Sequence, residues 1–121
     1  MRIFINHTNH ASSGWGEQQK DAADKYGVTV DIPFPTIPST LESNRVKELA
    51  KKTFEAIRLV KPEAVLCQGE STYTYELVRL LKDEGIKVLA ACSERVAHEV
   101  VRDDGTVEKK SEFKFVKFRE Y

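Results

Sequence analysis

The stretch Ala64-Val65-Leu66-Cys67-Gln68-Gly69-Glu70-Ser71-Thr72 places a continuous apolar run directly before a polar turn. A short apolar run bounded by polar residues is typical of a strand that is buried on both faces of a sheet. The segment that follows, residues 71–84, is predicted to be a helix that ends at Gly85. Strand, turn and helix in this order predict one unit of an α/β fold with a parallel sheet.

The rest of the chain repeats this alternation. Strands are predicted at residues 2–6, 28–33 and 88–91, and helices at 16–26 and 41–60, where apolar positions recur at helical spacing. Residues 96–101 and 106–118 flank Asp103-Asp104-Gly105, a hairpin signal, so the sheet should finish with antiparallel strands. The sequence has no repeat, low-complexity segment or linker, and we expect a single domain over residues 1–121.

Composition limits the ligand classes. The 19 Lys and Arg residues balance the 19 Asp and Glu residues, so no net field attracts long nucleic acids or an anionic membrane, and a short ligand fits better. The first residues are too short an apolar run for a signal peptide, and no stretch approaches the ~20 residues of a membrane span. These features predict a cytoplasmic protein.

The two cysteines, Cys67 and Cys92, lie in apolar runs without CxxC spacing. They are expected to be buried reduced thiols.

Candidate site residues follow three predicted strands. They form the segments Asn6-His7-Thr8-Asn9-His10, Gln68-Gly69-Glu70-Ser71-Thr72 and Ser93-Glu94-Arg95. Ligands of open parallel sheets bind outside the carboxyl ends of the strands, so these loops are expected to form one crevice.

The turn at Gly69 has two interpretations. Glycine permits a sharp strand-to-helix turn, and Ser71 or Thr72 could cap the helix while its free amides face an anion such as phosphate. A plain capping turn without a ligand explains the same residues.

His7 and His10 also have several possible roles. They could supply a general base, a phosphate donor or metal ligands, or simply pack the loop. No third ligand stands at a suitable spacing, so neither a metal nor another cofactor is predicted.

Other residues have equally open roles. Arg95 suits phosphate or adenine recognition unless it pairs with Glu94, and Trp15, Tyr73 or Tyr75 could stack on a base or fill the core. Residues 113–119 alternate aromatic and basic side chains, which fits a half-buried edge strand. Alternatively, the basic residues face a ligand or a second subunit.

Together with Thr74-Tyr75 and the closing Phe118-Arg119-Glu120-Tyr121, these motifs resemble the small stand-alone CARF-like (CRISPR-associated Rossmann fold) proteins of type III systems. Several of those proteins are ring nucleases. The resemblance implies a Rossmann-like sheet flanked by helices and a homodimer that binds cyclic oligoadenylate across its two-fold axis. It further implies metal-independent cleavage to linear products that end in a 2′,3′-cyclic phosphate. The substrate expected is cyclic tetra- or hexa-adenylate, with the tetra-adenylate ring preferred.

Carried over by position, the resemblance makes His7, beside Thr8, the candidate acid or base. Arg95 would neutralise the charge of the phosphate. Gln68 and the amides from Gly69 to Thr72 would lie near phosphate or ribose. Asn6, His10, Ser93 and Glu94 complete the expected binding site. An imidazole that titrates near neutral pH favours catalysis over a non-catalytic sponge or sensor of the same messenger. A nucleotide or phosphoester hydrolase unrelated to CRISPR is the third interpretation.

Overall fold

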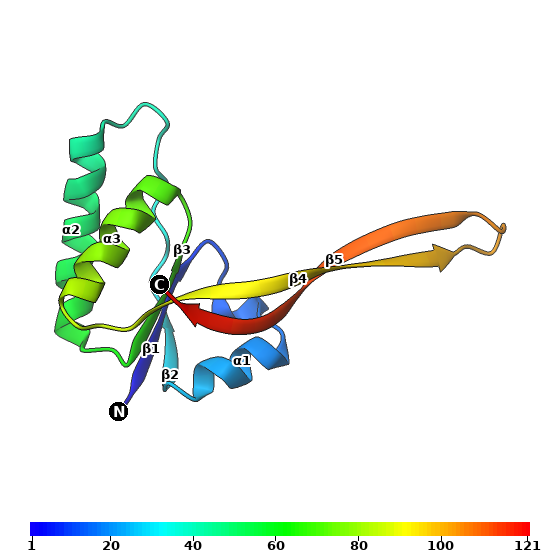
Figure 1. Ribbon diagram of the computed structural model, residues 1–121, viewed down its shortest axis with the longest axis horizontal. Coiled ribbons are helices and arrows are strands. Elements are labelled where there is room, and N and C mark those ends of the chain that lie inside the picture. Colours follow the sequence, from blue (N-terminus) through cyan, green and yellow to red (C-terminus); the bar gives the residue numbers. More distant parts are fainter.

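The computed structural model describes residues 1–121 and shows an α/β fold built on a five-stranded sheet in the order β2-β1-β3-β4-β5 (Figure 1). The first four strands are parallel and the last pair is antiparallel, as predicted. The strands are β1 Ile3–Thr8, β2 Val28–Asp31, β3 Ala64–Gln68, β4 Val88–Val101 and β5 Val107–Glu120. The α-helices are α1 Glu17–Asp24, α2 Ser43–Val60 and α3 Ser71–Asp83, and a short 3-10 turn spans Ser12–Gly14. None of these helices is long and apolar enough to cross a membrane.

The direction of winding reverses between β1 and β3. From β1 the chain passes through α1 to β2 at one edge of the sheet, and α2 then returns it across β1 to β3. From β3 the chain continues through α3 toward the opposite edge. The loops that leave β1 and β3 therefore diverge, which opens a crevice at the carboxyl ends of these two strands.

Alternate residues of the inner strands feed two separate cores. Ile5, Val65 and Cys67 pack against α2 and α3 on one face of the sheet. Phe4 and Leu66 pack with Trp15 and with Ala23 of α1 on the other face. Side chains of a strand alternate between faces, so both faces of β1 and β3 are covered and these strands read as continuous apolar runs. Figure 1 shows α2 and α3 together on one side and α1 on the other.

The prediction for β4 was wrong in its length. Residues 88–91 and 96–101 were expected as separate strands, with Ser93-Glu94-Arg95 as a loop between them, but β4 continues through all of them. Its partner β5 supplies the backbone hydrogen bonds beyond the parallel part of the sheet, with a register shift between Cys92 and Ser93. The hairpin beyond that shift, residues 93–115, extends away from the body of the protein (Figure 1) and is called the arm below.

The two cysteines differ in burial. Cys67 is fully buried, as expected, whereas Cys92 is only partly buried, and both are free thiols. Cys92 lies on β4 next to the register shift, where the sheet leaves the body and begins the arm. The prediction of two buried thiols is therefore correct for Cys67 alone.

Candidate functional site

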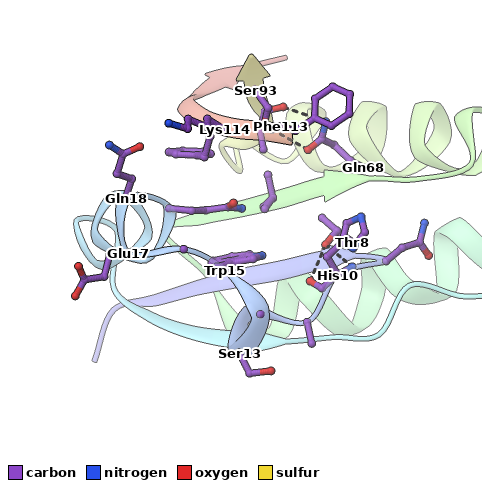
Figure 2. Close-up of a pocket in the computed structure, with 18 of the residues that line it drawn as sticks. Thr8, His10, Ser13, Trp15, Glu17, Gln18, Gln68, Ser93, Phe113 and Lys114 are labelled. Atoms are coloured by element: carbon purple, nitrogen blue, oxygen red, sulfur yellow. Dashed lines mark hydrogen bonds between the residues drawn. The ribbon is translucent and has the colours of Figure 1, made fainter. Parts of the chain in front are cut away.

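A cavity of about 1100 Å³ lies at the carboxyl ends of β1 and β3, where the winding reverses (Figure 2). Its walls are the loop after β1 (residues 8–11), the entry to α1 (13–19), the end of β3 and the base of the arm. The arm contributes Ser93, Phe113, Lys114 and Phe115. We call it the switch-point cavity, because ligands of open α/β sheets bind at this reversal.

Asn6 holds the loop after β1 in place. Its Nδ2 donates to the His10 carbonyl oxygen and to Asp31 Oδ1, both at 2.9 Å. Asp31 in turn accepts from the backbone amide of Ser12. Burial alone would raise the pKa of Asp31, but hydrogen bonds from the Asn6 side chain and from Ser12 hold it below its usual value. Asn6 is buried and acts on the cavity by fixing the loop, not by reaching a ligand.

Thr8 and His10 are the predicted site residues of this loop that line the cavity. The Thr8 hydroxyl lies 2.9 Å from Asn6 Oδ1 and accepts from the His10 amide. The His10 side chain is exposed, and no hydrogen bond occupies its imidazole. An imidazole in this position is free to exchange a proton with a bound molecule.

His7 does not lie in the cavity. It is 1% exposed, and it points to the opposite face of the sheet because it follows Ile5 by two residues. Its Nδ1 is 2.8 Å from the Ile32 carbonyl oxygen and its Nε2 is 2.8 Å from the Tyr73 hydroxyl. Burial lowers the pKa of His7, and the Ile32 hydrogen bond offsets this only in part. The structure thus makes His7 a neutral core residue, against the expectation that it leads the chemistry.

Gln68 lies at the edge of the cavity and also joins two strands. Its Oε1 accepts from the Ala91 amide at 2.8 Å, and its Nε2 donates to the Ala91 carbonyl oxygen at 3.4 Å (Figure 2). The β3–β4 ladder ends at Leu66 and Leu89, so the side chain continues the backbone pairing where the strands separate. Gln68 therefore fixes the width of the cavity at this end.

Of the two interpretations of the turn at Gly69, the structure supports the capping turn, because the start of α3 is not open to an anion. Glu70, not Ser71 or Thr72, is the N-cap, and its carboxylate accepts from the amides of Thr72 at 2.6 Å and Tyr73 at 3.3 Å. Hydrogen bonds, first of all from the Thr72 hydroxyl, hold the pKa of Glu70 below its usual value. A phosphate here would meet a carboxylate and occupied amides. Ser71 and Thr72 line a different cavity of about 700 Å³, beside α2.

Gly69 is required by packing and not by a positive φ. A Cβ at this position would overlap the ring of Phe34, which lies over the turn. Phe34 also packs against His7 and Tyr73, with ring centroids 5.2 and 5.1 Å away. The proline-containing loop after β2 is thereby fixed over the end of β3.

Only part of the segment Ser93-Glu94-Arg95 reaches the cavity. Ser93 lines it, but Glu94 and Arg95 do not, although they lie opposite the lining residues Lys114 and Phe113 of β5. Arg95 instead donates to Ser111 Oγ at 3.4 Å. The cation of the cavity wall is instead Lys114 (Figure 2). Beside it, Phe113 is 76% exposed, which leaves an aromatic surface available to a ligand.

The start of α1 forms one wall of the cavity, and sequence reasoning did not predict it as part of the site. Gly16 is its N-cap and makes no side-chain hydrogen bond, so the first-turn amides of Glu17, Gln18 and Gln19 keep their donor capacity at the cavity. Trp15 forms part of the floor but is 9% exposed and packs edge-on to Phe4, so it offers little surface for stacking. Gly16 before a helix was the available signal, because it leaves a helix start uncapped.

The cavity therefore combines one unoccupied imidazole, one lysine, one exposed aromatic ring and helix-start amides with the carboxylate of Glu17 in the first turn of α1. This set suits a ligand with both a flat base and a negative charge.

Comparison with known protein families gives a match. The model of the uncharacterized protein MJ1673 family matches residues 2–119 of the chain. No curated protein and no solved structure matches it significantly.

Proposed function

Because this chain belongs to the uncharacterized protein MJ1673 family, we propose its function from the site: it binds cyclic oligoadenylate at the switch-point cavity and cleaves it. In this proposal the protein is a small CARF-like, Rossmann-like ring nuclease of type III CRISPR systems. It acts in the cytoplasm and switches off the antiviral signal, with cyclic tetra-adenylate as the first ring to test. The observation that carries the proposal is the position of the cavity at the carboxyl ends of β1 and β3.

The residues of the cavity match the parts of an adenylate. The exposed ring of Phe113 offers a stacking surface for adenine, and Lys114, the next residue of β5 on the other face of the arm, offers a positive charge for phosphate. The uncapped start of α1 adds backbone donors for a second phosphate. At about 1100 Å³ the cavity lies at the upper end of the ~300–1,000 Å³ range of common small-molecule sites, so it has room for a nucleotide.

The proposed reaction is an internal transfer of the phosphodiester. A ribose 2′-hydroxyl attacks the adjacent phosphorus, the bond to the 5′-oxygen breaks, and the products are a 2′,3′-cyclic phosphate and a 5′-hydroxyl. The proton lost by the 2′-hydroxyl is balanced by the proton gained at the 5′-oxygen, so neither water nor a metal enters the balance. Holding the two oxygens in line with phosphorus supplies much of the rate.

His10 is the candidate acid or base for these proton transfers. It is the histidine that lines the cavity, whereas His7 lies in the core and His98 on the arm. Lys114 would stabilise the charge that develops on the phosphate oxygens. In a homodimer, two such cavities would face one ring across the two-fold axis.

The second candidate is a protein that binds the same ring without cleaving it. The observation in its favour is that the cavity wall carries a single imidazole and no partner that orients it. A general base is commonly held by a third group, and His10 has none. Binding without turnover would leave the protein as a sponge or sensor of the messenger.

Incubation of the purified protein with labelled cyclic tri-, tetra- and hexa-adenylate in EDTA tests both candidates. We expect cleavage of one ring, and a loss of about 100-fold or more in rate for His10→Ala with binding retained. His98→Ala is the matched control, because it removes an exposed imidazole that does not line the cavity. Binding without cleavage would support the sponge, and no binding to any ring would overturn both candidates.

A further inference from the structure

The outer edge of β5 is a long strand edge without a partner. β5 is the last strand of the sheet, runs for 14 residues and contains neither proline nor glycine. Its cross-strand partners are all on β4, and no loop or cap forms backbone hydrogen bonds with residues 107–120. Such an edge presents a row of free N–H and C=O groups that can pair with another strand.

The arm also lacks the support that a two-stranded hairpin needs. Beyond the register shift its strands pair only with each other, and Phe113 and Val107 are 76% and 57% exposed. An isolated hairpin is marginally stable in water, and further strands or a packed face are needed for independent stability. Pairing with another strand would therefore stabilise the arm.

We propose that the occupant is a second copy of this chain, paired through β5 to β5 in antiparallel register about a two-fold axis at Ser111. In this register two residues oppose each other when their numbers sum to 222. The two sheets would join into one continuous sheet. This inference rests on the arm alone and does not depend on the ligand proposed above.

Charge complementarity on the polar face of β5 favours this register over the two neighbouring ones. Along one face of β5 the side chains Glu108, Lys110, Glu112 and Lys114 alternate in sign. The two-fold at Ser111 places Lys110 opposite the partner's Glu112, an unlike-charged pair that occurs twice. Lys114 also falls opposite the partner's Glu108, a carboxylate that already pairs with Arg102 of its own chain at 2.6 Å, so the Lys110–Glu112 pairs carry the argument. Unlike charges directly opposite each other stabilise paired strands, and like charges destabilise them.

Neighbouring registers fail the same test. An axis at Lys110 places Glu108 opposite the partner's Glu112 and sets the two Lys110 side chains against each other. An axis at Glu112 opposes Lys110 to the partner's Lys114. Within its own hairpin Lys110 lies opposite His98 and Glu112 opposite Val96, and neither forms an ion pair in the chain.

The other face of the strand is complementary in a different way. Val107 falls opposite the partner's Phe115, and Lys109 opposite the partner's Phe113, an apolar pair and a cation beside an aromatic ring. Phe113 and Phe115 line the switch-point cavity. The partner's arm would therefore extend the wall of each cavity, so a ligand site of this protein is complete only in the dimer.

Charge reversal tests the register directly by sedimentation velocity at low salt. Lys110→Glu and Glu112→Lys each oppose like charges at two symmetric positions and should weaken the dimer by about tenfold or more. The double variant Lys110→Glu/Glu112→Lys restores both pairs and should dimerise like the wild type. An equimolar mixture of the two single variants should form heterodimers.

Lys51→Glu, on the exposed side of α2, makes the same change in net charge and should leave the dimer intact. A monomeric wild type, a dimer unaffected by Lys110→Glu, or no recovery in the double variant would each overturn the proposal. These measurements need no cyclic oligoadenylate. A failed ring assay with a charge-sensitive dimer would therefore disprove the proposed function and leave the interface standing.

Discussion

The Nε2 atom of His7 lies 2.8 Å from the hydroxyl oxygen of Tyr73, and this contact links β1 to α3. The other ring nitrogen, Nδ1, faces the Ile32 carbonyl oxygen, which can only accept, so Nδ1 carries the proton. Tyr73 is hydrogen-bonded in turn to Thr53 of α2 at 3.0 Å. His7 is therefore the centre of a buried network that joins β1, the loop after β2, α2 and α3.

Replacing His7 is expected to affect stability and not ligand recognition. His7→Ala removes one buried and one partly buried hydrogen bond and leaves a cavity, which should lower the free energy of unfolding by about 2–4 kcal/mol. His10→Ala, at an exposed position, should change it by less than about 0.5 kcal/mol. Urea denaturation measures both, and equal stability of the two variants would contradict the structural role of His7.

The same residue predicts a dependence of stability on pH. Burial lowers the pKa of His7 in the folded protein below its ordinary value of 6.5, so below pH 6.5 the unfolded chain binds a proton that the folded chain does not. Stability therefore falls as the pH drops from 6.5 toward the folded pKa, with a slope of at most about 1.4 kcal/mol per pH unit. In His7→Phe this contribution should disappear, so its stability should fall less steeply than that of the wild type between pH 6.5 and 5.

Glu70 should stabilise α3 without contributing to anion binding. Glu70→Ala removes the cap from the Thr72 and Tyr73 amides and should cost about 1 kcal/mol at pH 7. The pKa of Glu70 is lowered in the fold, so this contribution is complete above about pH 4.5 and is lost as the pH falls through the folded value. Wild type and variant should therefore converge in acid, whereas Glu63→Ala, at an exposed position, should match the wild type throughout.

Hydrophobic pattern and glycine positions predicted the order of the elements, because the strands β1 and β3 are buried on both faces. The same reasoning missed the continuity of β4. Ser93, Glu94 and Arg95 are exposed in the arm, so the strand there has no burial pattern to detect. One signal was available: a strand over residues 106–118 needs a partner of similar length, which residues 96–101 cannot supply.

The crevice between the ends of β1 and β3 was predicted from topology, but the side chains that enter it were only partly identified. Adjacent residues of a strand point to opposite faces, so Thr8 and His7 could not share one cavity wall. Which of them lines the cavity depends on the side of the sheet that α1 covers, and the sequence of β1 does not encode that. Lys114 and Phe113 reach the cavity through the hairpin register, which no local pattern specifies.

Gly69 and Phe34 should behave as a coupled pair. Gly69→Ala places a Cβ in the space of the Phe34 ring and should cost about 1–3 kcal/mol through displacement of that ring. In a Phe34→Ala background the space is free, so the same substitution should cost much less. A double-mutant cycle by urea denaturation measures the coupling, and additive effects would show that the ring does not constrain position 69.

The two cysteines should differ sharply in reactivity toward a thiol reagent such as 5,5′-dithiobis(2-nitrobenzoate). Cys67 is fully buried, and burial raises the pKa of its thiol to about 12, so the reactive thiolate is both rare and inaccessible in the native protein. Cys92 is partly exposed beside the register shift at the base of the arm. One thiol should therefore react in the native state and the second only after unfolding in urea, with Cys92→Ala removing the native reaction. Rapid native labelling in Cys92→Ala would show that β3 opens to solvent far more readily than its packing between two cores implies.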